Sequence, residues 1–130
     1  YVDEGIKLRK AGIRQAIFVL NASEHEFEQC IRYHLEPEIH TIDQFKALAR
    51  STASKLRPIQ FHLKIETGMN RLGFRLTELD DFINSYKNTD KLRLKSVFSH
   101  LAASEAEAER TFTRDQFKTL NFTSIDNTSI

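Results

Sequence analysis

The sequence predicts an α/β fold in which a parallel sheet is built from alternating strands and helices. Short apolar runs of strand length alternate regularly with amphipathic stretches of helix length. The run AIFVL at 16–20 is continuously apolar, as expected for a strand covered on both faces. An open doubly wound sheet and part of an eight-stranded barrel both fit this alternation, and periodicity does not distinguish them. We expect about four strands, at residues 16–20, 38–42, 59–66 and 92–100.

The expected helices carry recognisable start and stop signals. Asp3 suits the positive amino end of the first helix, and Gly12 provides its stop. Ser23 and Glu26 have the spacing of a capping box, and we expect Asp43 to cap the following helix. We expect helices at residues 3–10, 23–34, 43–55, 77–86 and 112–122.

Composition limits the classes of function. The chain has 130 residues, 40% of them hydrophobic, and a formal net charge of only +1. This near-neutral balance gives no long-range field for nucleic acid, and no apolar run approaches the roughly 20 residues that span a bilayer. We therefore expect one domain segment over 1–130, no nucleic-acid or membrane partner and no metal. The single cysteine, Cys30, fits a reducing compartment, so we expect a cytoplasmic protein.

Both ends of the sequence look unfinished. The chain starts at Tyr1 without an initiator methionine and enters a helical pattern at once. It finishes on the polar stretch TSIDNTSI at 123–130. We therefore expect a piece of a longer protein, with open strand edges that favour self-association.

The expected strand at 59–66 has one polar face. Side chains alternate across a strand, so Gln60, His62, Lys64 and Glu66 share a face opposite the apolar residues. A central parallel strand is normally apolar on both faces. The polar face therefore indicates either an edge strand with one wet face or a strand that lines a polar cavity.

Polar residues also follow the ends of two expected strands. Arg71 lies between Gly68 and Gly73, where glycines allow a tight turn close to a ligand and the guanidinium suits an oxygen acceptor. His100 ends the last strand, on the same face as Ser96. Active sites of α/β folds form at the carboxyl ends of strands. A solvated arginine and a structural histidine are the alternatives.

Three segments resemble alanine racemases. FHLKIETGMNRLGF at 61–74 is similar to their signature L-K-x-D/E-T-G-M-x-R-L-G, which is a highly specific motif. DEGIKLRKAGI at 3–13 resembles their E-G-x-x-L-R-x-A-G-I segment, and SHLA at 99–102 resembles S/T-H-x-A. The resemblance covers essentially the whole chain. It implies part of a TIM (β/α)8 barrel, roughly strands three to six with their helices, from the N-terminal domain of a homodimeric enzyme.

The resemblance implies roles for three residues toward the cofactor pyridoxal 5'-phosphate. Arg71 matches an arginine that donates a hydrogen bond to the phenolic oxygen of the cofactor, and His100 matches a histidine packed against its ring. Lys64 matches a lysine that is carbamylated in some members. An unmodified Lys64 paired with Glu66 is an equal alternative.

The family's catalytic residues fall outside the chain. Its cofactor-anchoring lysine precedes Tyr1, and its acid–base tyrosine belongs to the C-terminal domain of the partner subunit. We therefore expect a part of an enzyme that interconverts L-alanine and D-alanine for peptidoglycan synthesis, inactive as 130 residues alone. A serine or broad-specificity amino-acid racemase, a non-catalytic barrel protein that binds pyridoxal phosphate, and a folding or assembly module remain alternatives. Fusion to a cell-wall ligase is left open.

Overall fold

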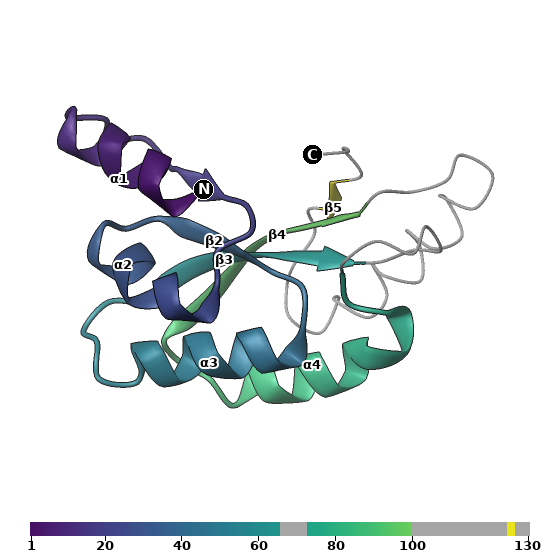
Figure 1. The fold of residues 1–130 in the computed structure, drawn as a ribbon. Coiled ribbons are helices and arrows are strands. Elements are labelled where there is room, and N and C mark those ends of the chain that lie inside the picture. The colour runs from purple at the N-terminus through teal and green to yellow at the C-terminus, as the bar shows by residue number, and fades with distance from the viewer. Residues whose placement is uncertain (66–72, 100–124, 127–130) are drawn as a thin grey trace.

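The computed structural model describes residues 1–65, 73–99 and 125–126. These residues form a five-stranded sheet in which every neighbouring pair is parallel. Figure 1 shows the sheet with α3 and α4 side by side along one of its faces. The strands are β1 (Phe18–Val19), β2 (Glu36–Ile39), β3 (Ile59–Ile65), β4 (Leu92–Ser99) and β5 (Ile125–Asp126).

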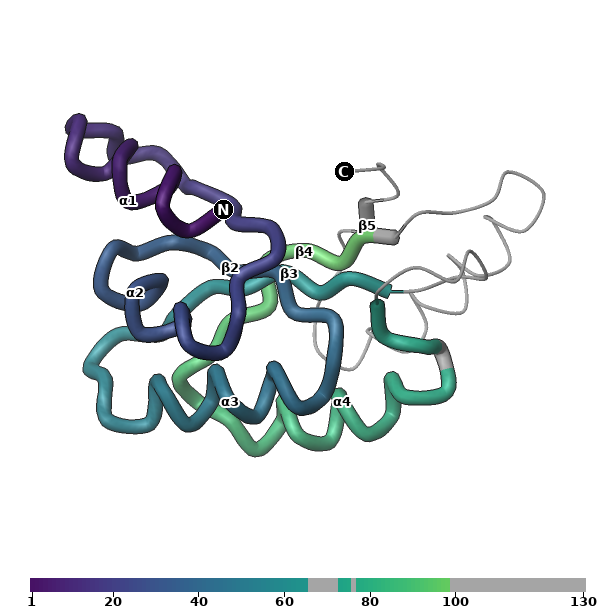
Figure 2. Tube along the Cα trace, viewed as in Figure 1, coloured from purple at the N-terminus to yellow at the C-terminus, as the bar shows by residue number. Residues whose placement is uncertain are grey.

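The strand order selects between the two architectures that periodicity left open. The strands follow one another across the sheet in sequence order, β1-β2-β3-β4-β5. A doubly wound sheet reverses its strand order at a switch point, whereas a barrel adds each strand to the same side. The structure is therefore part of a (β/α)8 barrel, and Figure 2 follows this one-directional progression along the chain.

The helices begin and end close to their sequence signals. α1 (Val2–Lys10) has acidic residues in its first turn and basic residues in its last, and Gly12 follows it at φ 94. That positive φ favours glycine at a helix end. Gly5 allows α1 to approach Leu35 closely, because a Cβ at this position would lie 3.0 Å from both methyl groups of Leu35 and they would have to shift. The other helices are α2 (Phe27–Arg32), α3 (Ile42–Thr52) and α4 (Leu79–Lys87), with 3-10 turns at Glu24–Glu26 and Leu76–Glu78.

Two predicted boundaries are wrong, and one capping motif is confirmed. Thr41, not Asp43, caps α3, because its hydroxyl accepts from the Gln44 backbone N–H at 3.0 Å. β2 starts at Glu36 rather than 38, because strand pairing and buried ion pairs extend across Pro37. At the 3-10 turn Glu24–Glu26 that precedes α2, Ser23 N–H donates to Glu26 Oε1 at 3.1 Å, as a capping box requires. The helix predicted at 112–122 lies outside the described residues.

An aromatic cluster fills the space between the sheet and its helices. Phe82 of α4 lies at its centre, with ring centroids 5.1 Å from Phe45, 6.2 Å from Phe61, 5.4 Å from Phe74 and 5.8 Å from Tyr86. Phe82 is fully buried. Edge-to-face and offset aromatic pairs add to the free energy gained by burying the rings. The face of β3 that carries Phe61 therefore packs into the hydrophobic core, and the polar residues of β3 lie on the opposite face.

Replacing Phe82 with alanine should lower the free energy of unfolding by about 3–5 kcal/mol, because the cavity left among four rings cannot collapse. Leu56→Ala is the control, since Leu56 is 94% exposed and its truncation should change stability by less than about 0.5 kcal/mol. Denaturant titration of both variants measures the difference. Equal, small effects would show that Phe82 is not the centre of the core.

Candidate functional site

The polar face of β3 lies against an equally polar face of β2. Glu38 of β2 pairs with His62 of β3 in the parallel register. Glu36, Glu38 and His62 are only 9%, 3% and 8% exposed. β3 is a central strand between β2 and β4, so the edge-strand alternative does not apply. Its polar residues line the inner face of the partial barrel, as the cavity-lining interpretation predicted.

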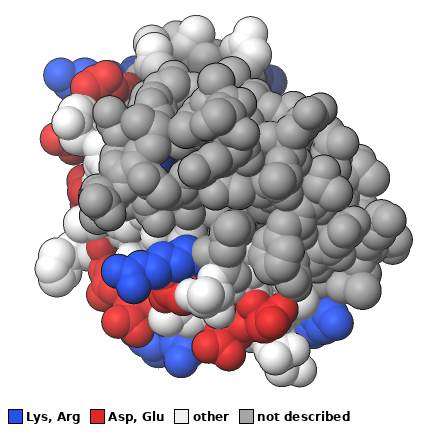
Figure 3. Space-filling view, turned by 90° about the vertical axis from the view of Figure 1, so that its right-hand side faces the viewer, with Lys and Arg blue, Asp and Glu red and all other residues white. Residues whose placement is uncertain are grey.

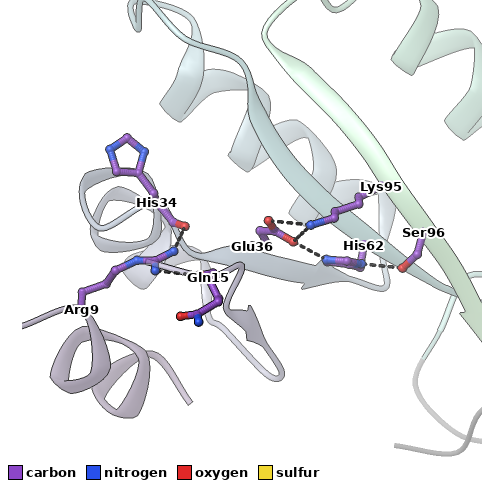
Figure 4. Close-up of polar contacts among 7 residues, drawn as sticks. All are labelled: Arg9, Gln15, His34, Glu36, His62, Lys95 and Ser96. Atoms are coloured by element: carbon purple, nitrogen blue, oxygen red, sulfur yellow. Dashed lines mark hydrogen bonds and ion pairs between the residues drawn. The ribbon is translucent and has the colours of Figure 1, made fainter. Parts of the chain in front are cut away.

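Four side chains form a continuous network toward the amino ends of the strands. Lys95 Nζ lies 3.1 Å from both carboxylate oxygens of Glu36. Glu36 Oε1 also lies 2.9 Å from His62 Nε2, and His62 Nδ1 hydrogen bonds the Ser96 hydroxyl. Figure 4 shows these residues converging from β2, β3 and β4. Both oxygens of the buried carboxylate are satisfied, which burial of a charge requires.

A β-bulge explains how two consecutive residues of β4 join this network. Phe61 pairs with Leu94 but His62 pairs with Ser96, so Lys95 is the extra residue. In a regular strand Lys95 and Ser96 would point to opposite faces. The Leu94 N–H at the bulge donates to the Tyr86 hydroxyl at 3.0 Å instead. The bulge therefore brings both Lys95 and Ser96 to the Glu36–His62 pair.

His62 is held as a neutral imidazole. A carboxylate only accepts hydrogen bonds, so Nε2 donates to Glu36 and the neutral ring leaves Nδ1 to accept from Ser96. Burial lowers the pKa of His62 below its ordinary 6.5, although the hydrogen bond and charge of Glu36 oppose the shift and Lys95 adds to it. The Phe18 ring, with its centroid 4.2 Å from the imidazole, contributes to the apolar surroundings.

A second group of polar residues lies one layer closer to the carboxyl ends of the strands. Glu38 Oε1 is 4.0 Å from Lys64 Nζ and 3.9 Å from His40 Nδ1. Its other oxygen accepts from the Asn21 backbone N–H at 3.4 Å. Burial lowers the pKa of His40 from 6.5, with Glu38 opposing and Lys64 adding to the shift. Lys64 is 21% exposed, so its ammonium reaches the edge of this inner face.

Lys64 is the predicted site residue that the structure describes. Arg71, His100 and Glu66 lie outside the described residues. The strands that lead to them are parallel neighbours, and Ile65 pairs with Ser99 at their carboxyl ends. Glu66 and His100 therefore follow paired residues directly. Among the described residues Lys64 contacts Glu38, and its expected pairing with Glu66 lies outside them.

Figure 3 looks at the molecule from the side toward which the strands run, and basic and acidic side chains lie close to one another along the lower margin of its described surface. Within residues 1–65, 73–99 and 125–126, no group of three or more His, Cys, Asp or Glu side chains is placed to hold a metal ion. No helix in those ranges is long and apolar enough to cross a membrane.

Sequence reasoning missed Glu36, Glu38 and Lys95. The alternation of Glu36 and Glu38 about Pro37 has the period of a strand and could have shown their common face. The expected strand at 38–42 begins after Pro37 and therefore leaves Glu36 outside it. Lys95 carries no such signal, because its orientation depends on the bulge in β4.

Residues 1–125 match the family model for the alanine racemase N-terminal domain. The chain belongs to this family. Among its curated relatives, an alanine racemase from Syntrophobacter fumaroxidans is 35% identical over 109 residues, which are 83% of this chain and 29% of the relative.

Solved structures show the same fold. The alanine racemase of Clostridium difficile 630 superposes with a TM-score of 0.80 at 21% identity, covering 98% of this chain and 38% of that one. A histidine racemase from Leuconostoc mesenteroides subsp. sake superposes with a TM-score of 0.69 at 22% identity, covering 98% of this chain and 36% of that one. The chain thus spans about a third of the length of the proteins it matches.

The neutral histidines predict a pH-dependent stability. Folding lowers the pKa values of His62 and His40 from 6.5. As the pH falls below this value, the unfolded chain therefore binds more protons than the folded chain. The free energy of unfolding should be nearly constant between about pH 7.5 and 8 and fall as the pH drops through about 6.5. Denaturant titrations at pH 7.5, 6.5 and 5.5 measure this loss.

His62→Gln should reduce the slope of the free energy of unfolding against pH between about pH 6.5 and 5.5, because one of the two histidines with a lowered pKa is removed. His25→Gln is the control, since His25 is an exposed residue of the 3-10 turn. The assignment fails if His62→Gln keeps the full slope while His25→Gln loses it.

Proposed function

We propose that the chain is part of a pyridoxal-phosphate-dependent alanine racemase that interconverts L-alanine and D-alanine. The family match over residues 1–125 carries this proposal. The parallel β3 and β4, paired up to Ile65 and Ser99, support it because they lead to Arg71 and His100 from adjacent positions of one edge. Active sites of (β/α)8 barrels are built at that edge.

In this proposal, residues 1–130 are the middle of the N-terminal barrel domain, with strands three to six of the barrel as β1 to β4 and the short β5 next to β4. The lysine that anchors the cofactor and the acid–base tyrosine belong to other parts of the protein. The 130 residues alone are then inactive, and the intact protein is a cytoplasmic homodimer that supplies D-alanine for peptidoglycan. The length of the relatives supports the placement of this chain inside a longer protein, since the chain covers 29% of the Syntrophobacter enzyme.

Lys64, the described residue of the proposed site, supports binding of pyridoxal phosphate at the carboxyl edge of the sheet. The cofactor is anionic, and Lys64 places an ammonium at this edge on the inner face. Arg71 would donate to its phenolic oxygen as a charge-assisted hydrogen bond, and His100 would pack against its ring. When bound, the cofactor supplies the electron sink that makes the α-proton of an amino acid removable.

Lys64 serves this site as an unmodified ammonium. Glu38 is 3% exposed, and Lys64 Nζ at 4.0 Å is its nearest lysine partner among the described residues. A carbamate on Nζ would remove that positive charge and place a second anion beside a buried carboxylate. The Glu38 carboxylate thus favours an unmodified Lys64 over a carbamylated one.

Incubation of the intact protein with 13C-bicarbonate should give no carbamate carbon resonance from Lys64, because a carbamate there would place a second anion beside the buried Glu38 carboxylate. Glu38→Gln should increase the carbamylated fraction, and Glu24→Gln, which changes an exposed carboxylate, should not. A carbamate resonance in the unaltered protein that is lost in Lys64→Gln would show that Lys64 is modified.

For the intact protein, Arg71→Ala should weaken cofactor retention and turnover by about 10–100-fold, the effect of losing a charged hydrogen bond of about 1.5–3 kcal/mol. Arg75→Ala is the matched control, because Arg75 is exposed just beyond the same loop. Cofactor absorbance after gel filtration and chiral chromatography of alanine measure the two effects. An intact protein that binds the cofactor but does not racemise alanine would refute the proposed reaction.

The acceptance of other amino acids is the second candidate function. The histidine racemase superposes at 22% identity, close to the 21% of the Clostridium difficile alanine racemase. The barrel therefore accommodates more than one substrate side chain. Assaying alanine, serine and histidine side by side with the intact protein distinguishes an alanine racemase from one of broad specificity.

A further inference from the structure

A cavity of about 360 Å³ lies at the amino-terminal ends of β2 and β3, away from the edge proposed for the cofactor. Arg9 of α1 and Arg14 of the connection after it form one wall, and the starts of β2 and β3 contribute Glu36 and Gln60. Lys95 reaches it from the bulge of β4. Figure 4 shows Arg9 and Lys95 on either side of the start of β2.

The described lining of this cavity is strongly cationic. Arg9, Arg14 and Lys95 supply three positive charges against the single carboxylate of Glu36, an excess of two. The whole chain carries only +1, so positive charge is concentrated here. A cleft lined by one sign of charge concentrates ions of the opposite sign.

Arg9 contributes a fixed charge. Its guanidinium donates to four backbone carbonyls, those of Tyr33 at 2.8 Å, Ile13 at 2.9 Å, Gln15 at 2.7 Å and His34 at 2.9 Å. These bonds hold the group against the wall and leave few donors for a ligand. Carbonyl oxygens carry only partial charges, so the full positive charge of Arg9 persists in the cavity.

Arg14 and Lys95 retain donors for a ligand. Arg14 is exposed, and no hydrogen bond or ion pair within the described ranges engages its guanidinium. Lys95 directs two contacts of 3.1 Å to Glu36, and an ammonium has three donors. Glu36 repels an anion weakly, because both its oxygens already face Lys95 and one accepts from His62.

We propose that this cavity binds a small oxyanion, either inorganic phosphate or a small phosphate ester. The planar fork of Arg14 matches two phosphate oxygens, the remaining donor of Lys95 contacts a third, and the fixed charge of Arg9 adds attraction. Binding is independent of racemisation, since none of these residues lies at the carboxyl edge. Anion binding is coupled to the buried network of the inner face, because Lys95 and His62 both contact the carboxylate of Glu36.

The cofactor-loaded intact protein should bind inorganic phosphate saturably in isothermal titration calorimetry at constant ionic strength set with chloride. Arg14→Gln should weaken this binding by roughly tenfold, the effect of losing one charge-assisted contact. Arg50→Gln is the matched control, because Arg50 is exposed on α3 and does not line the cavity. Glu36→Gln should tighten binding by removing the only described carboxylate of the lining.

Repeating the titration with glycerol 3-phosphate shows whether the cavity prefers inorganic phosphate or a phosphate ester, since the preferred ligand binds more tightly. Phosphate should also shift the imidazole NMR resonances of His62 in the parent protein but much less in Arg14→Gln. The proposal is overturned if neither ligand saturates, or if Arg14→Gln and Arg50→Gln bind equally well. If Glu36→Gln does not fold, the comparison of Arg14→Gln with Arg50→Gln still tests the proposed site.

Discussion

Two carboxylates buried on the inner face of a parallel sheet impose the constraint on which the arrangement depends. Glu36 and Glu38 are 9% and 3% exposed, and a charge removed from water must be paired. Lys95 and His62 surround the first, and Lys64 and His40 lie around the second. Each set draws on more than one element, so the charges hold the strands in one relative register.

The two faces of β3 have different roles because of this division. Phe61 on one face packs with the rings of α3 and α4, while His62 on the other faces Glu36 and Ser96. A one-residue slip would exchange these environments and bury unpaired charge in the aromatic core. The bulge at Lys95 accommodates the extra residue of β4 without that exchange, because it restores the register of Ser96 with His62.

The inner face also separates two environments along the strands. The Lys95–Glu36 pair opens to the cationic cavity at the amino ends, and the Lys64–Glu38 pair lies toward the carboxyl ends. Barrel enzymes place their chemistry at the carboxyl ends. The proposed cofactor position and the proposed oxyanion position are thus at opposite ends of one polar interior. His62 lies between them, neutral and linked by hydrogen bonds to both Glu36 and Ser96.

The sequence by itself determined the alternation of strands and helices, the polar face of β3 and the family motif at 61–74, because these depend on local periodicity and short-range residue order. Periodicity alone did not distinguish a barrel from an open sheet, since that depends on which strand edges pair, whereas the family motif implied the barrel that the strand order confirms. The sequence did not determine the partners of Glu36, Glu38 and Lys64. Lys95 meets Glu36 across 59 residues of sequence only because β4 bulges where it passes His62. Contacts between distant segments are set by register and packing, which exist only once the chain has folded.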